Sequence, residues 1–367
     1  MSSTPDKLDS IQLLRALAAT AVVVFHIPLF RNGAWGVDIF FVISGFIIAL
    51  VTEKSSRHFF AKRIIRVVPL YWLGTFGVFG VACLMPNLLD NTTADITGLI
   101  KSLFFIPYLK GEYAQPLLYL GWTLNFEMFF YALFAVAMAI SHRHRLAIAS
   151  AMILALVLLG QLVAFESVVA SFYTSEILAE FALGLGCYAL YKRTARWRAA
   201  GPSRSARRLL VVTAVICLGC MPFSGLLDPL LGRAGYWGIP ATLAFLALVH
   251  GLSGVTLPRS VVLIGDASYS LYLFHPYVLK TFNKVFHIYD LPGPLPYLLA
   301  PLAILVCFMV AVALYRLVEH PLTQWLRVTF LEKRHHAPLG SGALDQRAPS
   351  GPPSDPTAAL RATAPGS

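Results

Sequence analysis

The feature that most constrains this chain is a series of long apolar runs that recur with little soluble sequence between them. The hydrocarbon core of a bilayer is about 30 Å thick, so a helix needs about 20 apolar residues to cross it. A run of this kind crosses as a helix because its backbone groups find no water in lipid. Ten such runs occur, near residues 11–30, 35–51, 68–85, 121–140, 146–164, 172–190, 209–223, 236–254, 261–280 and 297–318. We therefore predict an all-α integral membrane protein, a bundle of about ten transmembrane helices.

Composition supports this interpretation. Of the 367 residues, 57% are hydrophobic and 13% are charged, whereas charged residues make up about 25% of a soluble domain. We expect one membrane domain over residues 1–330, since no soluble block separates the apolar runs. Residues 331–367 are rich in Pro, Ala, Gly and Ser, and we expect them to form a disordered cytoplasmic tail.

The positive charge of the chain is concentrated in alternate loops. Basic residues gather in segments 54–66, 142–145 and 191–208 and after the tenth run, while the loops between them are acidic or nearly neutral. Basic loops stay on the cytoplasmic side of a membrane, so this pattern predicts that both termini are cytoplasmic. Membrane orientation also explains the formal net charge of +11, and we expect no nucleic-acid partner.

The cysteines give no sign of a metal site. All 5 lie in or beside apolar runs, and Cys217 and Cys220 have no second pair and no nearby histidines. Cysteines in such positions usually behave as small apolar side chains. We therefore expect neither a zinc site nor a disulfide framework.

The first apolar run carries two ionisable residues, Arg15 and His26, within QLLRALAATAVVVFH. Eleven positions of an α-helix turn by about 1100°, or about 20° past three turns, and rise about 16 Å. Both side chains are thus predicted on one helix face. Ionisable groups inside a membrane usually face protein or a wet cavity, so the pair predicts a path between the inner side and the outer half. Alternatively, Arg15 reaches the inner headgroups and His26 lies at the outer interface.

Other runs supply polar residues at matching depths. In the predicted orientation the outer half holds His26, Asp38, Asn125, Glu127 and His275, Ser44 lies near the middle, and the inner side holds Arg15, Arg63 and Arg66. Arginines bind phosphate groups in a bidentate manner. A histidine can act as a general base, and a neighbouring carboxylate can orient it. This arrangement predicts a phosphate-bearing donor on the inner side and a hydroxyl acceptor on the outer side.

Several segments resemble motifs of the acyltransferase-3 family of membrane-bound acyltransferases. Arg15 and His26, with ten residues between them, resemble its R/K-x10-H signature. The other similar segments are GVDIFFVISGF (36–46), FAKRIIRVVPLYW (60–72), GWTLNFEMFFY (121–131), SYSLYLFHP (268–276) and YRLVEHPL (315–322). The similarity covers about residues 8–328 and is greatest to bacterial exopolysaccharide acyltransferases. One difference is Lys62, where many members have arginine.

The resemblance implies transfer of an acyl group, most often acetyl, from cytoplasmic acyl-CoA to a hydroxyl of an extracytoplasmic or lipid-linked polysaccharide. It also implies a multi-pass protein of the bacterial inner membrane, with polysaccharide assembly machinery as a potential partner. By position, His26 would be the catalytic base, with Glu127 as its partner or as a second catalytic group. The donor mouth would be formed by Arg15, Arg63, Arg66, Tyr71 and Trp72.

Four further residues match the family motifs without an assigned role: Asp38, Ser44, Asn125 and His275. For Ser44 and its neighbour Gly45, the simpler interpretation is close helix packing through small residues. The aromatic residues Tyr71 and Trp72 could equally belong to the interfacial belt of a membrane protein.

The sequence leaves several alternatives open. Acyl transfer could proceed directly or through an acyl-His26 intermediate. A transporter of a sugar or lipid precursor also fits buried charges in a polytopic protein, although no inverted repeat is evident. A passive subunit of a polysaccharide complex is a third hypothesis. No motif specifies the acceptor or the acyl group.

Overall fold

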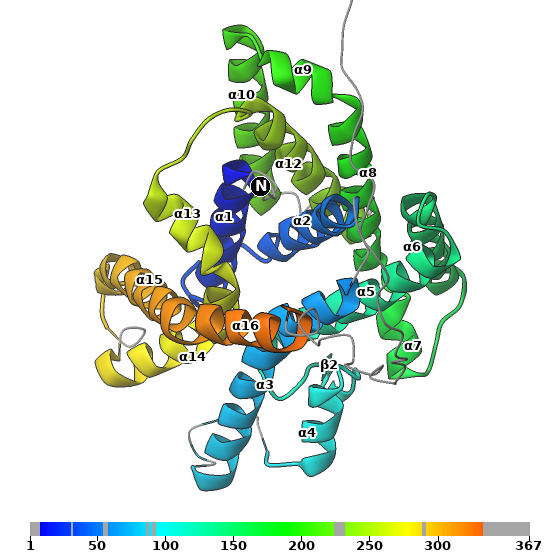
Figure 1. Ribbon diagram of the computed structural model, residues 1–367. Helices are drawn as coiled ribbons and strands as arrows, with labels where there is room; N and C mark the ends of the chain where they lie inside the picture. The colour runs from blue at the N-terminus through cyan, green and yellow to red at the C-terminus, as the bar shows by residue number, and fades with distance from the viewer. Residues whose placement is uncertain are drawn as a thin grey trace, which may run out of the picture.

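The computed structural model describes residues 8–30, 32–53, 58–85, 87, 89, 93–223, 232–287 and 291–332. Its helices are α1 (Asp9–Phe25), α2 (Gly36–Val51), α3 (Phe59–Leu84), α4 (Ile96–Leu103), α5 (Trp122–Ile140), α6 (Arg145–Leu162), α7 (Val168–Tyr173), α8 (Ala179–Arg193), α9 (Ala195–Ala200), α10 (Arg204–Cys220), α12 (Ile239–Gly251), α13 (Arg259–Asp266), α14 (Ser268–Phe286), α15 (Leu295–Leu314) and α16 (His320–Arg327). Two short strands, β1 (Leu109–Lys110) and β2 (Tyr113–Ala114), pair as an antiparallel hairpin. Figure 1 shows these helices as one bundle.

Each of the ten apolar runs falls mainly on helical residues, which confirms the helical class, although the runs near 172–190 and 261–280 are each divided between two helices. Six helical stretches of the described chain are long and apolar enough to cross a membrane: Phe59–Leu84, Tyr119–Ile140, Arg145–Leu162, Val168–Arg193, Arg204–Phe223 and Leu295–Leu331. The others are shorter or more polar; α2, for example, is an apolar helix of 16 residues. The count of ten spans and the position of the termini remain predictions. The expected tail falls almost entirely on residues 333–367, outside the described ranges.

The outer wall of the bundle is apolar. In the most apolar 18-residue segment of α6, only 17% of the residues are buried inside the protein. In the corresponding segment of Arg204–Phe223, which contains α10, the share is 11%. On α10 the exposed side chains include Leu209, Val212, Val215 and Ile216. An apolar surface of this extent is unfavourable in water and suits the hydrocarbon core of a bilayer. The packing therefore supports the membrane location that the apolar runs predict.

Helix α2 lies at the centre of the bundle and packs closely against α8. A Cβ atom on Gly45 would lie 2.3 Å from the carbonyl oxygen of Phe181, and one on Gly184 would lie 2.3 Å from that of Val42. Only glycine permits such an approach of two helix backbones. The interpretation of Gly45 as a close-packing residue is therefore correct.

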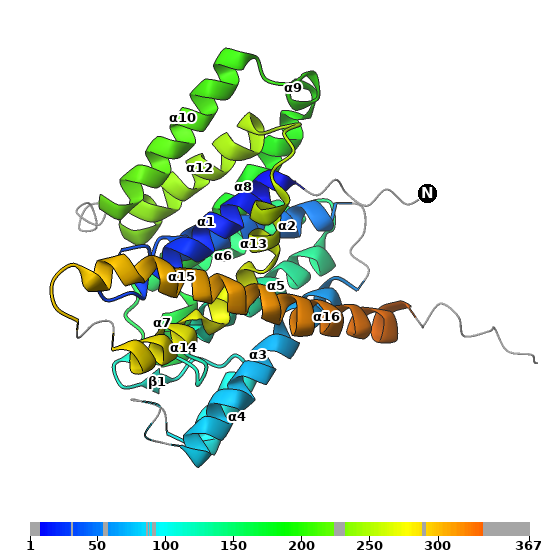
Figure 2. The ribbon, with the colours of Figure 1, turned by 90° about the vertical axis from the view of Figure 1, so that its left-hand side faces the viewer.

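The last helix is interrupted by a π-helical turn, Tyr315–Glu319, between α15 and α16. Figure 2 shows α15 and α16 as one continuous rod across the bundle. Pro321 follows the π-helical turn in the first turn of α16. Proline cannot donate a backbone hydrogen bond, which disrupts regular α-helical pairing, and such wide turns are frequent at functional sites. Here the turn carries Glu319, whose side chain is buried.

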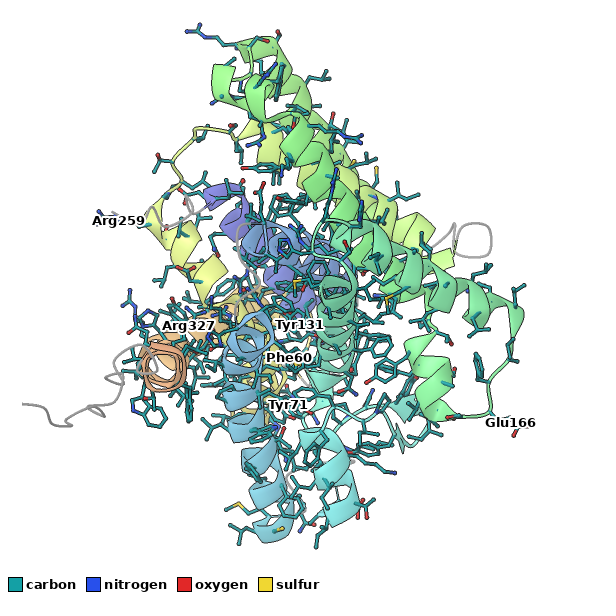
Figure 3. All side chains as sticks on the ribbon, turned by 45° about the vertical axis from the view of Figure 1, so that its right-hand side comes forward. Phe60, Tyr71, Tyr131, Glu166, Arg259 and Arg327 are labelled. Atoms are coloured by element: carbon teal, nitrogen blue, oxygen red, sulfur yellow. The ribbon has the colours of Figure 1, made fainter. Side chains whose placement is uncertain are left out.

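The two ends of the bundle differ in charge. In Figure 2, α9 and the end of α16 lie on one side, whereas α7 and β1 lie on the other. Figure 3 shows Arg259 and Glu166 on opposite sides of the molecule. Since α9 carries Arg196 and Arg198, the basic and acidic loops separate as the alternating charge pattern predicts. The basic residues Lys54 and Arg57 lie outside the described residues.

Candidate active site

A cavity of about 130 Å³ is lined by residues of α1, α2, α3, α5 and α14. The α2 residues that line it are Val37, Phe40, Phe41, Ile43, Ser44 and Ile47, most of them three or four positions apart. This spacing of three and four residues is that of one helix face. The cavity changes in character along its length, from a cationic end through an acidic middle to an apolar end.

The cationic end contains the three predicted arginines, Arg15, Arg63 and Arg66. Arg15 Nε donates a hydrogen bond of 3.1 Å to Ser268 Oγ. Arg63 Nε is buried and has no hydrogen-bond partner among the described residues. The structure thus brings together arginines from α1 and α3 that are far apart in sequence. The N–H group of Arg63 that has no partner can donate to an anion.

Arg66 has a carboxylate partner that the sequence analysis did not identify. Its Nη1 lies 3.0 Å from Glu319 Oε1. Ser270 Oγ donates to the second oxygen, Glu319 Oε2, at 2.6 Å. Glu319 lies within YRLVEHPL, and the rule that an ionisable group inside a membrane faces protein or a wet cavity could also have found this residue.

Glu127 occupies the middle of the cavity. Its carboxylate accepts a hydrogen bond of 3.3 Å from Ser44 Oγ and another from the hydroxyl of Tyr131, a residue that Figure 3 labels near the centre of the bundle. The expected pairing of Glu127 with His26 is not observed: within the described chain Glu127 bonds to Ser44 and Tyr131, whereas His26 bonds to Val22 and His275. Asn125 is buried but does not line the cavity, and its Oδ1 has no partner among the described residues.

The apolar end is closed by Phe40 and Tyr272. Their rings meet edge to face with centroids 5.8 Å apart. The hydroxyls of Tyr272 and Thr123 form a hydrogen bond of 2.9 Å, which fixes the Tyr272 ring. Both Thr123 and Tyr272 line the cavity.

His26 and His275 form a pair beyond this apolar end. His26 is the C-cap of α1, and its Nδ1 lies 3.2 Å from His275 Nε2. His275 follows Tyr272 on α14 by three residues, or about 4.5 Å along the helix. His26 is not among the residues that line the cavity, so the path from Arg15 to His26 stays a prediction. Helix α1 ends at Phe25, and Phe40 lines the cavity while also packing against the apolar cluster that contains Val23 and Leu271.

Hydrogen bonds define the tautomers of both histidines. His26 Nδ1 lies 2.8 Å from the carbonyl oxygen of Val22, and His275 Nδ1 lies 2.9 Å from that of Leu271. A carbonyl oxygen only accepts, so each Nδ1 carries the proton. His275 Nε2 is then an acceptor facing His26. His26 Nε2 keeps its lone pair and is buried without a partner among the described residues.

Asp38 does not belong to the cavity, in contrast to its expected site-lining position. It is fully buried, and Arg233 Nε and Nη2 donate to its two oxygens at 3.1 and 2.9 Å. Arg233 also donates its backbone N–H to Glu176 at 2.8 Å. This bidentate pair links α2 to the π-helical turn Ala234–Gly238, a structural role.

Tyr71 and Trp72 likewise lie away from the arginine end, where they were expected. Tyr71 donates its hydroxyl to the carbonyl oxygen of Ser102 at 3.0 Å. Trp72 Nε1 donates to that of Leu103 at 3.0 Å. Both residues therefore anchor the end of α4 to α3, and neither lines the cavity.

Comparison with known proteins identifies the family. A model described as an acyltransferase domain, that of the acyltransferase-3 family, matches residues 8–316. The chain is 36% identical over 302 residues to the exopolysaccharide production protein ExoZ of Rhizobium meliloti (strain 1021), covering 80% of this chain and 90% of that protein. It is 25% identical over 277 residues to the putative acetyltransferase ORF330 of Acidianus two-tailed virus, covering 71% and 80% of the two chains.

A further relative is the O-acetyltransferase OatA of Staphylococcus aureus, 25% identical over 362 residues. That match covers 87% of this chain and 58% of OatA. No solved structure matches. With the family model matched over most of its length, and with membrane-length helices around a charged cavity, this chain belongs to the acyltransferase-3 family and is a membrane acyltransferase.

Proposed function

We propose that this protein transfers an acyl group, acetyl in the first instance, from cytoplasmic acyl-CoA to a hydroxyl of an extracytoplasmic or lipid-linked polysaccharide. The observation that carries the proposal is the arrangement of the cavity. Three arginines lie at one end, and a histidine pair with a free imidazole lone pair lies just past the other. The names of ExoZ and OatA support a polysaccharide acceptor and an acetyl group.

The arginine end suits the phosphates of a coenzyme A thioester. Arg15, Arg63 and Arg66 provide planar donor groups of the kind that bind phosphate oxygens. The cavity volume of about 130 Å³ corresponds to about four water molecules at about 30 Å³ each. It holds the thioester end of the donor, so the nucleotide remains outside the arginine end.

His26 is suited to act as general base. Its Nε2 takes the proton of the acceptor hydroxyl while that oxygen attacks the thioester carbonyl, the C–O bond forms, and the C–S bond breaks. The imidazolium then returns the proton to the thiolate of coenzyme A. A general base contributes about 10²–10⁴-fold to the rate, and positioning of the two substrates provides more. An acyl-His26 intermediate would use the same lone pair as nucleophile.

The reaction requires that the cavity and the histidine pair become connected. We infer that the Phe40–Tyr272 ring layer lies between them, since both rings line the cavity and α14 carries Tyr272 and His275 one turn apart. Donor binding at the arginines would bring the acyl group against this layer. A side-chain movement of Phe40 then opens the short remaining path to His26.

The charge distribution supports a bacterial inner membrane location with the arginine end toward the cytoplasm. Helix α9 and the end of α16 lie on one side of the bundle, and this side carries the basic segments (Figure 2). Both chain ends lie on that side under the positive-inside rule. The donor pool and the arginines are then in the same compartment, and polysaccharide assembly proteins are potential partners.

Transfer can be measured directly in membranes that contain the protein. Acetyl-CoA labelled in the acetyl group is added, and label in ester linkage to the surface glycan is quantified by mass spectrometry and NMR. A strain lacking the gene and its complemented strain give the comparison. The proposal predicts one added acetyl mass per modified sugar only in the complemented strain. Identical glycans in both strains would contradict it.

A further inference from the structure

We propose that Phe40, together with Tyr272, sets the size of the acyl group that the enzyme transfers. This inference rests on the proposed function, because it takes the cavity as the donor site. It goes further by assigning the acyl-binding end and the residue that limits its length. Neither Phe40 nor Tyr272 is charged or part of the histidine pair, so the inference concerns selection of the donor and not the proton transfer.

Two hydrogen bonds fix the direction of the cavity. Arg15 bonds to Ser268 at 3.1 Å, and Thr123 bonds to Tyr272 at 2.9 Å. Ser268 and Tyr272 are four residues apart on α14, so they lie one turn apart on the same face. The cavity therefore runs from Arg15 and Ser268 toward Thr123 and Tyr272. A donor that enters past the arginines, with its nucleotide outside the cavity, has its acyl end at Tyr272.

The acyl end is apolar and narrow. Val37, Phe40, Phe41, Leu124 and Tyr272 line it. Apolar walls favour a hydrocarbon group over a charged one, which disfavours dicarboxylic acyl groups such as succinyl. The whole cavity measures about 130 Å³, so little room remains beyond the thioester for additional methylene groups.

Phe40 is the wall that determines the available length. Its ring meets that of Tyr272 edge to face at 5.8 Å, and Tyr272 is held in turn by Thr123. The side chain of Phe40 has no polar group that would tie it to a neighbour. It also contacts the small apolar cluster that includes Leu271 and Val23, next to the histidine pair. Removing the Phe40 ring would lengthen the cavity in the direction of His26.

The same helix provides a matched control at the other end of the cavity. Ile47 lines the cavity on the same face of α2, seven residues or about 10.5 Å from Phe40. Ile47→Ala also removes apolar volume from the lining. It enlarges the cavity near the arginines, where the acyl group would not lie, so donor selection should not change.

The test is a competition between two donors in membranes that contain equal amounts of wild-type, F40A or I47A protein. Acetyl-CoA and butyryl-CoA are supplied together, and acetyl and butyryl esters on the glycan are counted by mass spectrometry. One methylene in an apolar pocket changes selectivity by about 10–200-fold. We expect F40A to raise the butyryl-to-acetyl ratio at least about tenfold, with the I47A ratio equal to wild type.

Two results would overturn the inference: a wild-type ratio in an active F40A protein, or an equal rise in I47A. If F40A is inactive, the butyryl-to-acetyl ratio is measured in Phe40→Leu instead. A wild-type ratio in that variant would also overturn the inference. These outcomes differ from failure of the proposed function, in which wild-type membranes transfer no acetyl group from acetyl-CoA. If all Phe40 variants transfer acetyl groups and keep the wild-type preference for acetyl-CoA over butyryl-CoA, only the assignment of the acyl end is rejected.

Discussion

His275 holds His26 in one tautomer. The Nδ1–H of His26 is shared between the carbonyl oxygen of Val22 at 2.8 Å and His275 Nε2 at 3.2 Å. His275 is itself held by its bond to Leu271. Both bonds of His26 use Nδ1, so the proton stays there and the Nε2 lone pair is left for chemistry.

His275 is therefore expected to act as a positioning residue. His275→Ala removes one of the two acceptors of His26 Nδ1–H, and a hydrogen bond of this kind contributes about 0.5–1.5 kcal/mol. We predict that kcat falls by about tenfold while KM for acetyl-CoA is unchanged, because His275 does not line the cavity. Steady-state transfer with labelled acetyl-CoA measures both constants. A rise in KM with constant kcat would instead place His275 at the donor.

Glu127 and its two hydroxyl partners, Ser44 and Tyr131, should differ in how much they contribute to the rate of acyl transfer. Glu127→Gln removes the negative charge in the middle of the cavity, whereas Ser44→Ala removes a bond of 3.3 Å to a carboxylate that keeps its bond from Tyr131. We predict that E127Q reduces transfer by about 10²-fold or more and that S44A reduces it by about fivefold, since one neutral partner contributes about 1 kcal/mol.

The ranking is read from initial transfer rates at matched protein levels. Tyr131→Phe should fall between the two variants, because the Tyr131 hydroxyl is the nearer partner of Glu127. A loss in S44A as large as that in E127Q would show that the hydroxyl, and not the carboxylate charge, is required at this point of the cavity.

Arg63 and Arg66 offer a contrast between donor binding and stability. Arg63 Nε has no partner among the described residues, whereas Arg66 pairs with buried Glu319 at 3.0 Å. Loss of a charged hydrogen bond to a phosphate costs about 1.5–3 kcal/mol, so R63Q and R66Q should each raise KM for acetyl-CoA by about 10–100-fold. R66Q should also lower Tm, because it leaves the Glu319 charge unpaired.

Thermal denaturation in detergent, followed by size-exclusion chromatography, separates the two arginine variants. Arg63→Gln is expected to keep the Tm of the wild type. If R66Q keeps it as well, the ion pair with Glu319 does not stabilise the fold.

The α2–α8 contact should be sensitive to a single methyl group. Gly45→Ala places a Cβ only 2.3 Å from the carbonyl oxygen of Phe181. The two helices must therefore separate, at a cost of about 1–3 kcal/mol. Gly77→Ala on α3 is the control, since a Cβ there meets no atom within 4 Å. We predict a lower Tm for G45A and an unchanged or higher Tm for G77A. Equal Tm values would show that α2 and α8 are not this closely packed.

The sequence predicted the helices well, but not which way their polar residues face. On α2 the cavity stripe includes Val37, Ser44 and Ile47, and Asp38 lies about 100° around the helix from Val37. The predicted depth of Asp38 was compatible with the site, but its side chain bonds to Arg233. On α3, Trp72 is nine residues from Arg63, or about 180° around the helix.

The partners of these residues come from distant segments, and this is why they could not be predicted. Arg233 and Glu319 are 195 and 253 residues from Asp38 and Arg66. Helical periodicity determines the face of each residue on its own helix, but it does not say which helix lies opposite. Arg15, Arg63 and Arg66 were placed together correctly, since all three lie near the same end of helices that share the cavity.

The most direct test of the account is the rate of acetyl transfer by His26→Ala in membranes with wild-type amounts of folded protein. Labelled acetyl-CoA is the donor, the native glycan is the acceptor, and kcat and KM are measured together. The account predicts that kcat falls by at least about 10²-fold while KM for acetyl-CoA stays near the wild-type value, because His26 lies outside the arginine-lined cavity. Wild-type kcat in this variant would contradict it.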